Sequence, residues 1–285
     1  MVMGGTVDGA AGNGWRSWGS HAVLLPYMDQ AALYDQVAEA IDNNWRACCG
    51  GPDAQGLLDS VSIPPFLCPS DSPPQNFKAW TNYAVSAGAN KGWSVGTVNE
   101  TGIFNQNIWV RMADITDGTS NVIAMSELVT TDQGGAPGSA ANLAVVRDHG
   151  GANGANGAPD RWIPGGSGVT EAMVTGWGQT ALASTNMNGN RVGERWFRGQ
   201  QGRNAFNTLL TPNSPYPNAT FHCDNCNYDG RGMHGARSKH TGGVHVLMAD
   251  GAVRFASENI DWTTWQMLGD RKDGETKGMA SPNDV

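Results

Sequence analysis

The sequence predicts a single α+β domain in which one amino-terminal helix packs on a mainly antiparallel β-sheet, with a long glycine-rich loop insertion. Apolar residues recur at helical spacing between residues 27 and 43, and they alternate along two runs on either side of Asp250-Gly251. The 39 glycines among 285 residues are about twice the usual share of roughly 7%, which indicates many turns. A chain of this length can bury a sizeable core.

The predicted helix runs from about Tyr27 to Asn43 and follows a glycine-rich, aperiodic segment. We take residues 1–14 as a flexible lead-in and residues 15–285 as the single domain. Pro26 suits the first turn of the helix. The apolar side chains that would form one stripe are Ala32, Leu33, Val37, Ala40 and Ile41. Such a stripe needs a sheet or another helix to cover it.

Short strand-like pieces alternate with turns from Thr81 onward, in the segments TNYAVSAG, TGIFNQ and NVIAMSEL. Between about residues 132 and 178 the chain becomes rich in Gly, Ala and Asn. This composition fits a flexible linker, but Trp162 and Trp177 lie inside it and need something to pack against. We therefore expect a long loop insertion on the surface of one domain.

The carboxyl-terminal third contains the clearest local pattern, a β-hairpin over residues 244–256. Asp250-Gly251 suits a two-residue turn with positive φ between its strands. The side chains expected on the buried face of the first strand are Val244, Val246 and Met248. After the hairpin, Asn259 or Asp261 is expected to cap a short helix.

The charge pattern argues against a nucleic-acid partner. The chain has 18 basic and 26 acidic residues, a formal net charge of −8, and its basic residues are scattered. Nucleic-acid binding needs a basic patch that displaces counterions from phosphate. No apolar run reaches the length of a membrane span, and the first 20 residues lack a basic segment followed by an apolar one.

The cysteines allow two readings. They are Cys48, Cys49, Cys68, Cys223 and Cys226. Cys223 and Cys226 form a CxxC half-site that, with nearby histidines such as His240 and His245, could bind zinc, but the histidine spacing is irregular for a closed tetrahedral site. We favour a disulfide from Cys68 to Cys223 or Cys226.

One loop partly matches a calcium-binding pattern. Asn225, Asn227 and Asp229 occupy the first alternating positions of such a loop. The match then fails, because Ala236 stands where the loop needs a bidentate Glu. Ordinary turn chemistry explains the same residues.

A second group of oxygen donors lies around a turn and the strand that follows it. Asp114 and Asp117 precede the strand, and Glu127 stands near its end. The three carboxylates could bind a cation such as calcium. We favour the alternative that they fasten the turn through hydrogen bonds from side chain to backbone.

The sequence contains no convincing signature of an enzyme. Ser94 lies in a GxSxG pattern, but the flanking segments AVSAGANK and TVNETG supply neither the strand nor the helix of a nucleophile elbow. A serine hydrolase is therefore the least favoured function. The 11 tryptophans could offer stacking platforms for sugars, with Trp162 and Trp177 as candidates, although tryptophans spread along a chain more often belong to the core.

Several segments, taken in order, resemble a bacterial family. They include GWRSWGSHAVLLPYMDQ, FLCPSD, RMADITDGTSNVIAMSE and SKHTGGVHVLMADGAVRF. They are similar to segments of the large family called domain of unknown function 1559, which is abundant in Planctomycetes and also labelled solute-binding-like. The clearest match is His240, nine residues, and then Asp250-Gly251, which resembles the carboxyl-terminal processing-associated motif of that family.

The resemblance implies an exported, pilin-like head on the cell surface. Members usually begin with a type IV prepilin leader and a long apolar helix, which this sequence lacks, so membrane contact is expected only through that missing helix. Export makes a disulfide through Cys68 natural. The expected partners are other pilin-like subunits or further copies of the chain.

From these observations we expect a non-enzymatic pseudopilin-like component of a surface or secretion apparatus. In this interpretation His240 and Asp250 are structural and pin the hairpin to its neighbour. The alternative is an extracellular module that binds a polysaccharide or another solute. We expect no catalytic residue and no certain cofactor, with calcium as the candidate ion.

Overall fold

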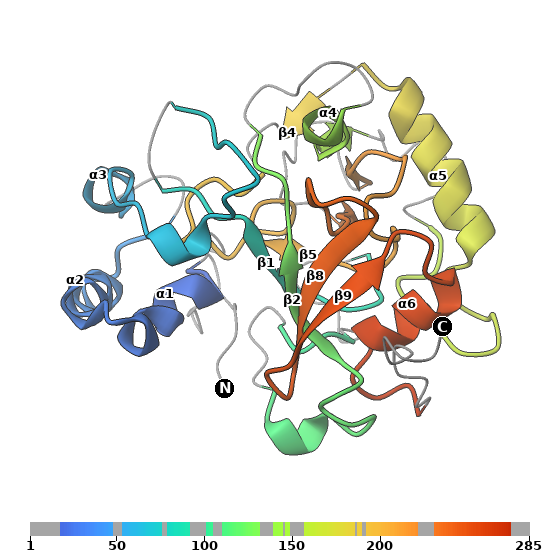
Figure 1. Ribbon diagram of the computed structural model, residues 1–285, viewed down its shortest axis with the longest axis horizontal. Helices are drawn as coiled ribbons and strands as arrows, with labels where there is room; N and C mark the ends of the chain where they lie inside the picture. The colour runs from blue at the N-terminus through green and yellow to red at the C-terminus, as the bar shows by residue number, and fades with distance from the viewer. Residues whose placement is uncertain are drawn as a thin grey trace.

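The protein is mixed α+β (Figure 1). The computed structural model describes residues 18–47, 53–75, 79–91, 101–104, 110–131, 139–144, 146–148, 157–185, 187–189, 192–221 and 231–274. The helices are α1 (Ser20–Leu24), α2 (Ala31–Asp42), α3 (Gln55–Leu58), α4 (Ala140–Ala144), α5 (Glu171–Ala183) and α6 (Trp262–Gly269), and the 3-10 turns are η1 (Leu25–Met28), η2 (Pro64–Phe66) and η3 (Met112–Asp114). Within these residues, no helix is both long and apolar enough to cross a membrane.

The larger sheet has five strands in the order β5-β1-β2-β8-β9. The strands are β1 (Tyr83–Ser86), β2 (Ile123–Glu127), β5 (Ala205–Phe206), β8 (Gly243–Met248) and β9 (Val253–Ser257). All neighbours are antiparallel except the pair β1 and β5. The predicted mainly antiparallel sheet is confirmed. Its central strand β2 lies between β1 and β8, so residues near the end of β2 contact segments from both sides.

The predicted hairpin is present as β8 and β9, with Val244, Val246 and Met248 buried. Its turn differs from the prediction. The Gly251 N–H donates to the Met248 carbonyl at 3.0 Å, and Gly251 at φ +91° is the turn residue with positive φ. The predicted two-residue turn is therefore wrong. Asp250 keeps a negative φ, and the glycine adds a bulge residue to a three-residue loop.

The amino-terminal helix is shorter than predicted and packs elsewhere. Asp29 adopts a left-handed φ of 56° at the end of η1, so α2 begins only at Ala31. Its buried side chains join a cluster with Trp18 and Trp196 that is separate from the core of the sheet. Figure 1 shows α1, α2 and α3 beside the sheet. The helix therefore packs into a separate amino-terminal cluster of aliphatic and aromatic side chains rather than onto the core of the sheet.

The segment expected as a loop insertion, residues 132–178, contains regular structure. Its described part includes α4, β3 and the start of α5, which Thr170 caps by accepting from the Met173 N–H. A second sheet has the order β4-β3-β6-β7. Its strands are β3 (Val146–Asp148), β4 (Met187–Gly189), β6 (Ala219–Thr220) and β7 (Gly232–Met233). Because this segment is rich in glycine, its sequence did not predict the helix α5. At Gly178 a Cβ would stand 2.4 Å from Cγ of Tyr216, so close packing excludes a side chain.

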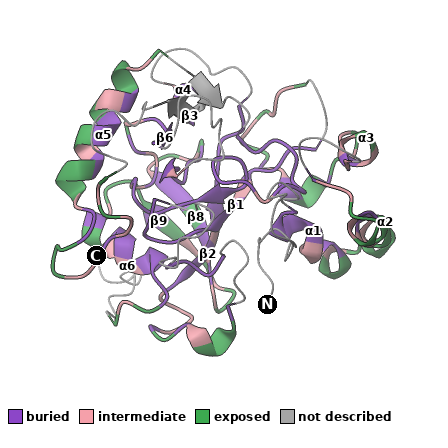
Figure 2. Cartoon of the chain, turned by 180° about the vertical axis from the view of Figure 1, so that it is seen from behind, coloured by how far each residue is buried: buried purple, intermediate pink, exposed green. Residues whose placement is uncertain are grey.

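Helix α6 covers part of the larger sheet. Asp261 caps it through a 2.8 Å hydrogen bond from the Thr264 N–H, as the sequence predicts. Trp265 and Leu268 lie in one cluster with the buried side chains of β8. Figure 2 shows that the central strands are mostly buried while α5 presents one exposed side. Polar side chains of the central strands can therefore approach solvent at the ends of these strands.

Candidate functional site

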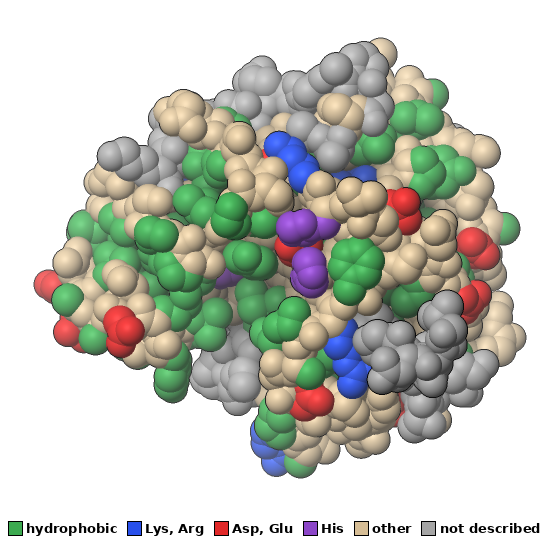
Figure 3. All heavy atoms as spheres, viewed as in Figure 1, with side chains coloured by type: hydrophobic (Ala, Val, Ile, Leu, Met, Phe, Trp, Pro, Cys, Tyr) green, Lys and Arg blue, Asp and Glu red, His purple; other side chains and the backbone are tan. Residues whose placement is uncertain are grey.

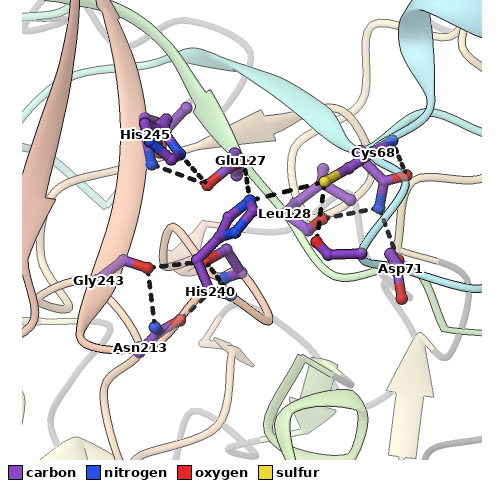
Figure 4. A network of polar contacts seen from close by, with 12 residues as sticks. Cys68, Asp71, Glu127, Leu128, Asn213, His240, Gly243 and His245 are labelled. Carbon is purple, nitrogen blue, oxygen red and sulfur yellow. Dashed lines mark hydrogen bonds and ion pairs between the residues drawn. The ribbon is translucent and has the colours of Figure 1, made fainter.

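Three segments that are far apart in the sequence meet where β2 ends and β8 begins (Figure 4). Cys68 follows the turn η2, Glu127 is the last residue of β2, and His240 lies in the loop before β8. Because β2 and β8 are antiparallel, the end of β2 lies against the beginning of β8. The topology of the sheet thus places Glu127 beside His240.

The donor atoms of these three side chains converge. The His240 Nε2 lies 3.0 Å from the Glu127 Oε1 and 3.7 Å from the Cys68 Sγ. The three donor atoms all lie within 4.8 Å of one another. Glu127 is buried, Cys68 is nearly so, and the His240 side chain is 33% exposed. The cluster therefore reaches the surface through its histidine. Figure 3 shows histidine side chains beside acidic atoms in the middle of one face.

The arrangement does not match a Cys-His-Glu catalytic relay. In such a relay, one ring nitrogen of the histidine faces the nucleophile and the other is held by the carboxylate. Here the same nitrogen, Nε2 of His240, faces both the Cys68 sulfur and the Glu127 carboxylate. The three groups point at a common centre rather than along a line.

Glu127 also ties β2 to the hairpin. Its Oε2 accepts a 2.8 Å hydrogen bond from the His245 N–H, and the His245 Nδ1 lies 3.5 Å from the same oxygen. The two carboxylate oxygens therefore face different groups, one toward His240 and the other toward the backbone of β8. This contact fixes the orientation of the buried carboxylate.

The loop that carries His240 is held by a chain of hydrogen bonds. The His240 N–H donates to the Ser238 hydroxyl at 3.0 Å, and this hydroxyl donates to the Gly243 carbonyl at 2.7 Å. The Asn213 side chain accepts from the Ser238 N–H at 2.9 Å. These contacts position the backbone of His240 independently of its ring.

The Cys68 loop is anchored in the same way. The Cys68 N–H donates to the Asn82 Oδ1 at 2.9 Å, and the Asn82 amide donates to the Leu128 carbonyl at 3.1 Å. The Ser70 hydroxyl lies 3.0 Å from the Cys68 sulfur. The thiol is therefore held next to the end of β2, within reach of a hydroxyl that can donate to a thiolate.

Asp71 is the charged centre of the neighbouring contacts. It accepts from the Thr130 N–H at 2.9 Å and lies 2.7 Å from the Lys239 Nζ. Burial alone would raise the pKa of the Asp71 carboxyl, but hydrogen bonds from Lys239, Thr130 and Asn82 outweigh it and hold that pKa below its usual value. Lys239 thus neutralises Asp71, and Asp71 stays outside the converging group.

A small pocket opens beside the cluster. Its lining includes Cys68, Glu127 and Lys239. Tyr83, on the adjacent strand β1, has a raised pKa because of burial and then because of the negative charges of Cys68 and Glu127. The pocket therefore brings the Cys68 sulfur and the Glu127 carboxylate, two potential metal ligands, to one small opening.

Comparison with protein families identifies the chain. The profile of the family described as "Protein of unknown function (DUF1559)" matches residues 3–263. The chain belongs to this family. The resemblance carried by the separate sequence segments is thereby confirmed at the level of the family. No curated protein and no solved structure matched the chain.

In this DUF1559 protein, the two ends of the His-to-Asp-Gly segment lie at opposite ends of β8. His240 contacts Glu127, whereas the Asp250 carboxylate accepts from the Ala252 N–H at 2.9 Å inside the hairpin turn. The Asp250 N–H donates to the Thr119 carbonyl at 3.0 Å. The segment thus contacts the β2 region at both ends, through the His240 ring at one end and the Asp250 backbone at the other.

Cys68 is a free thiol in the structure, and the disulfide predicted from it to Cys223 or Cys226 is not seen. Its sulfur points toward Ser70 and His240 instead. The other candidate residues of that region, Cys223, Cys226, Asn225, Asn227 and Asp229, lie outside the described residues, as does Ser94.

Asp114, Asp117 and Glu127, which the sequence offered as a less favoured cation site, do not converge. Asp114 accepts from the Arg111 N–H at 2.8 Å within its own turn, whereas Asp117 accepts from the Gly274 N–H at 3.1 Å and so ties this turn to a segment 157 residues away. Glu127 belongs to the converging group with Cys68 and His240. Among the described residues, this trio is the group of three such side chains whose donor atoms come together.

Trp162 and Trp177 are core residues. They are 5% and 6% exposed, and Trp177 packs against Phe221 with ring centroids 5.1 Å apart. Neither ring offers an open face on which a sugar could stack. Their burial explains why the glycine-rich segment folds onto the domain.

The supporting residues Asn82, Asp71 and Lys239 were not singled out by the sequence. Asp71 and Lys239 lie inside two segments used for the family resemblance, FLCPSD and SKHTGGVHVLMADGAVRF, yet no spacing connects them. Their positions become meaningful only after the sheet brings residues 68–71, 127–130 and 238–240 together.

Proposed function

We propose that this DUF1559 protein is a non-enzymatic structural head of a pilin-like surface or secretion assembly. The observation that supports this proposal is that the segment from His240 to Asp250 fastens the hairpin to the rest of the sheet. His240 and Asp250 connect the β8-β9 hairpin to the β2 region at both ends. A domain built to withstand assembly benefits from such ties between distant segments.

The described chemistry also favours a structural role. The one Cys-His-Glu group found among the described residues lacks the arrangement of a proton relay, because a single histidine nitrogen faces both partners. The pilin-like architecture and the extracellular location are part of this proposal and rest on the family resemblance.

A binding module for a polysaccharide or another solute is the alternative. Its two candidate stacking residues, Trp162 and Trp177, are buried. The alternative therefore keeps no named platform among the described residues, and we prefer the structural role.

Assembly can be tested in the bacterium that makes the protein. We expect a tagged full-length chain to appear in the sheared cell-surface fraction and to cross-link there to itself or to pilin-like subunits identified by mass spectrometry. Affinity electrophoresis through gels that contain soluble polysaccharides should show no retardation. A chain that stays monomeric in every fraction, or one that polysaccharide retards, would contradict the proposal.

A further inference from the structure

We propose that Cys68, Glu127 and His240 bind a divalent transition-metal ion of the zinc class, with one coordination position left to solvent. The proposal goes beyond the structural role of the head and does not depend on assembly. It rests on the convergence of a thiol, a carboxylate and an imidazole from three separate segments.

The distances match a shared ion. In a tetrahedral zinc site with usual bond lengths, a sulfur and a nitrogen ligand lie about 3.5 Å apart, and a nitrogen and an oxygen ligand lie about 3.3 Å apart. The corresponding separations here are 3.7 Å from the Cys68 Sγ to the His240 Nε2 and 3.0 Å from that nitrogen to the Glu127 Oε1. Both separations lie within a few tenths of an ångström of the tetrahedral values, and the third, between the Cys68 Sγ and the Glu127 carboxylate, is no more than 4.8 Å.

The donor set selects the class of metal. A cysteine thiolate and a neutral imidazole suit zinc and similar transition metals, whereas calcium and magnesium take oxygen ligands. Only Glu127 supplies oxygen among the three side chains. The calcium ion considered from the sequence is therefore the wrong class for this site.

The surroundings hold each ligand in place. The Glu127 Oε2 is fixed by the His245 N–H, which leaves Oε1 directed toward His240. The Ser70 hydroxyl lies 3.0 Å from the Cys68 sulfur, where it can donate to a thiolate. Contacts of this kind orient metal ligands and tune their affinity.

The site is partly open to solvent. The His240 side chain is 33% exposed, and the small pocket beside Cys68 and Glu127 adjoins the donor atoms. Three protein ligands with an open fourth position fit this partly exposed arrangement. An ion here would join the loop after η2, the end of β2 and the loop before β8, segments that lie 113 and 172 residues apart for the two contacts of His240.

Metal titration of the purified full chain tests the proposal. Metals are first removed with a chelator, and zinc binding is then measured by competition with a chromophoric chelator. We expect zinc to bind at one site that requires Cys68. Cobalt(II) should produce a thiolate-to-metal charge-transfer band and the intense visible bands of a tetrahedral ion. Cys68→Ser should abolish the charge-transfer band of this site. Glu127→Gln and His240→Gln should each weaken zinc binding by more than about 100-fold, because loss of an outer partner alone costs about 10–100-fold.

The matched control is Glu258→Gln, which changes an exposed carboxylate on the same hairpin. It should bind zinc as the unchanged chain does. Circular dichroism of each metal-free variant verifies that it is folded. The proposal would be overturned if folded Cys68→Ser, Glu127→Gln and His240→Gln kept the zinc affinity and the cobalt spectrum of the wild-type chain. It would also be overturned if the wild-type chain bound no zinc.

Discussion

Replacing Glu127 by Ala is expected to lower the free energy of unfolding by about 3 kcal/mol, even in the presence of a chelator. The substitution removes the acceptor of the 2.8 Å hydrogen bond from the His245 N–H and the partner of the His240 ring. The bond from the His245 N–H is partly buried, and a hydrogen bond to a charged group contributes about 1.5–3 kcal/mol. In this variant, only the backbone pairing of β2 with β8 would connect the end of β2 to the hairpin.

Urea unfolding measures this effect. Glu258→Ala is the control, because Glu258 is exposed and its loss should change the stability by less than about 0.5 kcal/mol. A loss below about 1 kcal/mol for Glu127→Ala, with an unchanged dependence on urea concentration, would show that the carboxylate does not fasten the hairpin.

The second large effect concerns His21, which is fully buried against Phe66 with the two rings nearly perpendicular. Burial lowers the pKa of His21 to about 4, and the nearby Tyr83 carbonyl offsets this only in part. Neither ring nitrogen makes a hydrogen bond of normal geometry. Because the folded-state pKa lies below the unfolded value of 6.5, only the unfolded chain binds this proton between those two values.

Stability should therefore fall as the pH decreases from about 6.5 to about 4, by about 3 kcal/mol in total, and this contribution should level off below that range. Urea unfolding at several pH values measures the slope. His21→Met, which places an apolar and adaptable side chain in the buried site and cannot titrate, should flatten this part of the profile.

The comparison isolates His21 from other titrating groups. The pKa of Asp270 is raised chiefly by burial, so Asp270 acts in the opposite direction and increases the free energy of unfolding as the pH falls. Because both proteins contain Asp270, its contribution cancels in the comparison. Equal slopes for the unchanged chain and His21→Met between pH 4 and 6.5 would contradict the assignment.

The sequence predicted those parts of the fold that depend on local patterns. Alternation in β8 identified its buried face, and Asp261, one of the two caps offered by the sequence beside Asn259, marks the start of α6. The turn at Asp250-Gly251 was located correctly, but its type was not, because the same dipeptide fits a two-residue turn and a three-residue turn with a bulge. Local chemistry restricts the choice without deciding it.

Packing between distant segments was harder to predict. The apolar stripe of α2 predicted that other side chains would cover the helix. Nothing near the helix in the sequence predicts that Trp196 belongs to the same cluster. Helix α5 was missed because Gly176 and Gly178 weaken the helical pattern, although the second glycine allows Tyr216 to approach. In both cases the deciding partner lies elsewhere in the chain.

The candidate site illustrates the same limit. Cys68, Glu127 and His240 were each singled out from the sequence, but for a disulfide, a calcium site and a structural pin. No spacing rule joins residues separated by 113 and 172 positions. The antiparallel pairing of β2 with β8 brings two of them together, and the loop after η2 delivers the third.

X-ray absorption at the zinc edge, on the chelator-treated chain loaded with one equivalent of zinc, tests the metal site most directly. The proposed ligands predict one sulfur at about 2.3 Å together with nitrogen and oxygen atoms at about 2.0–2.2 Å, and loss of the sulfur in Cys68→Ser. A shell without sulfur, or one with two or more sulfurs that survives Cys68→Ser, would contradict zinc binding by Cys68, Glu127 and His240.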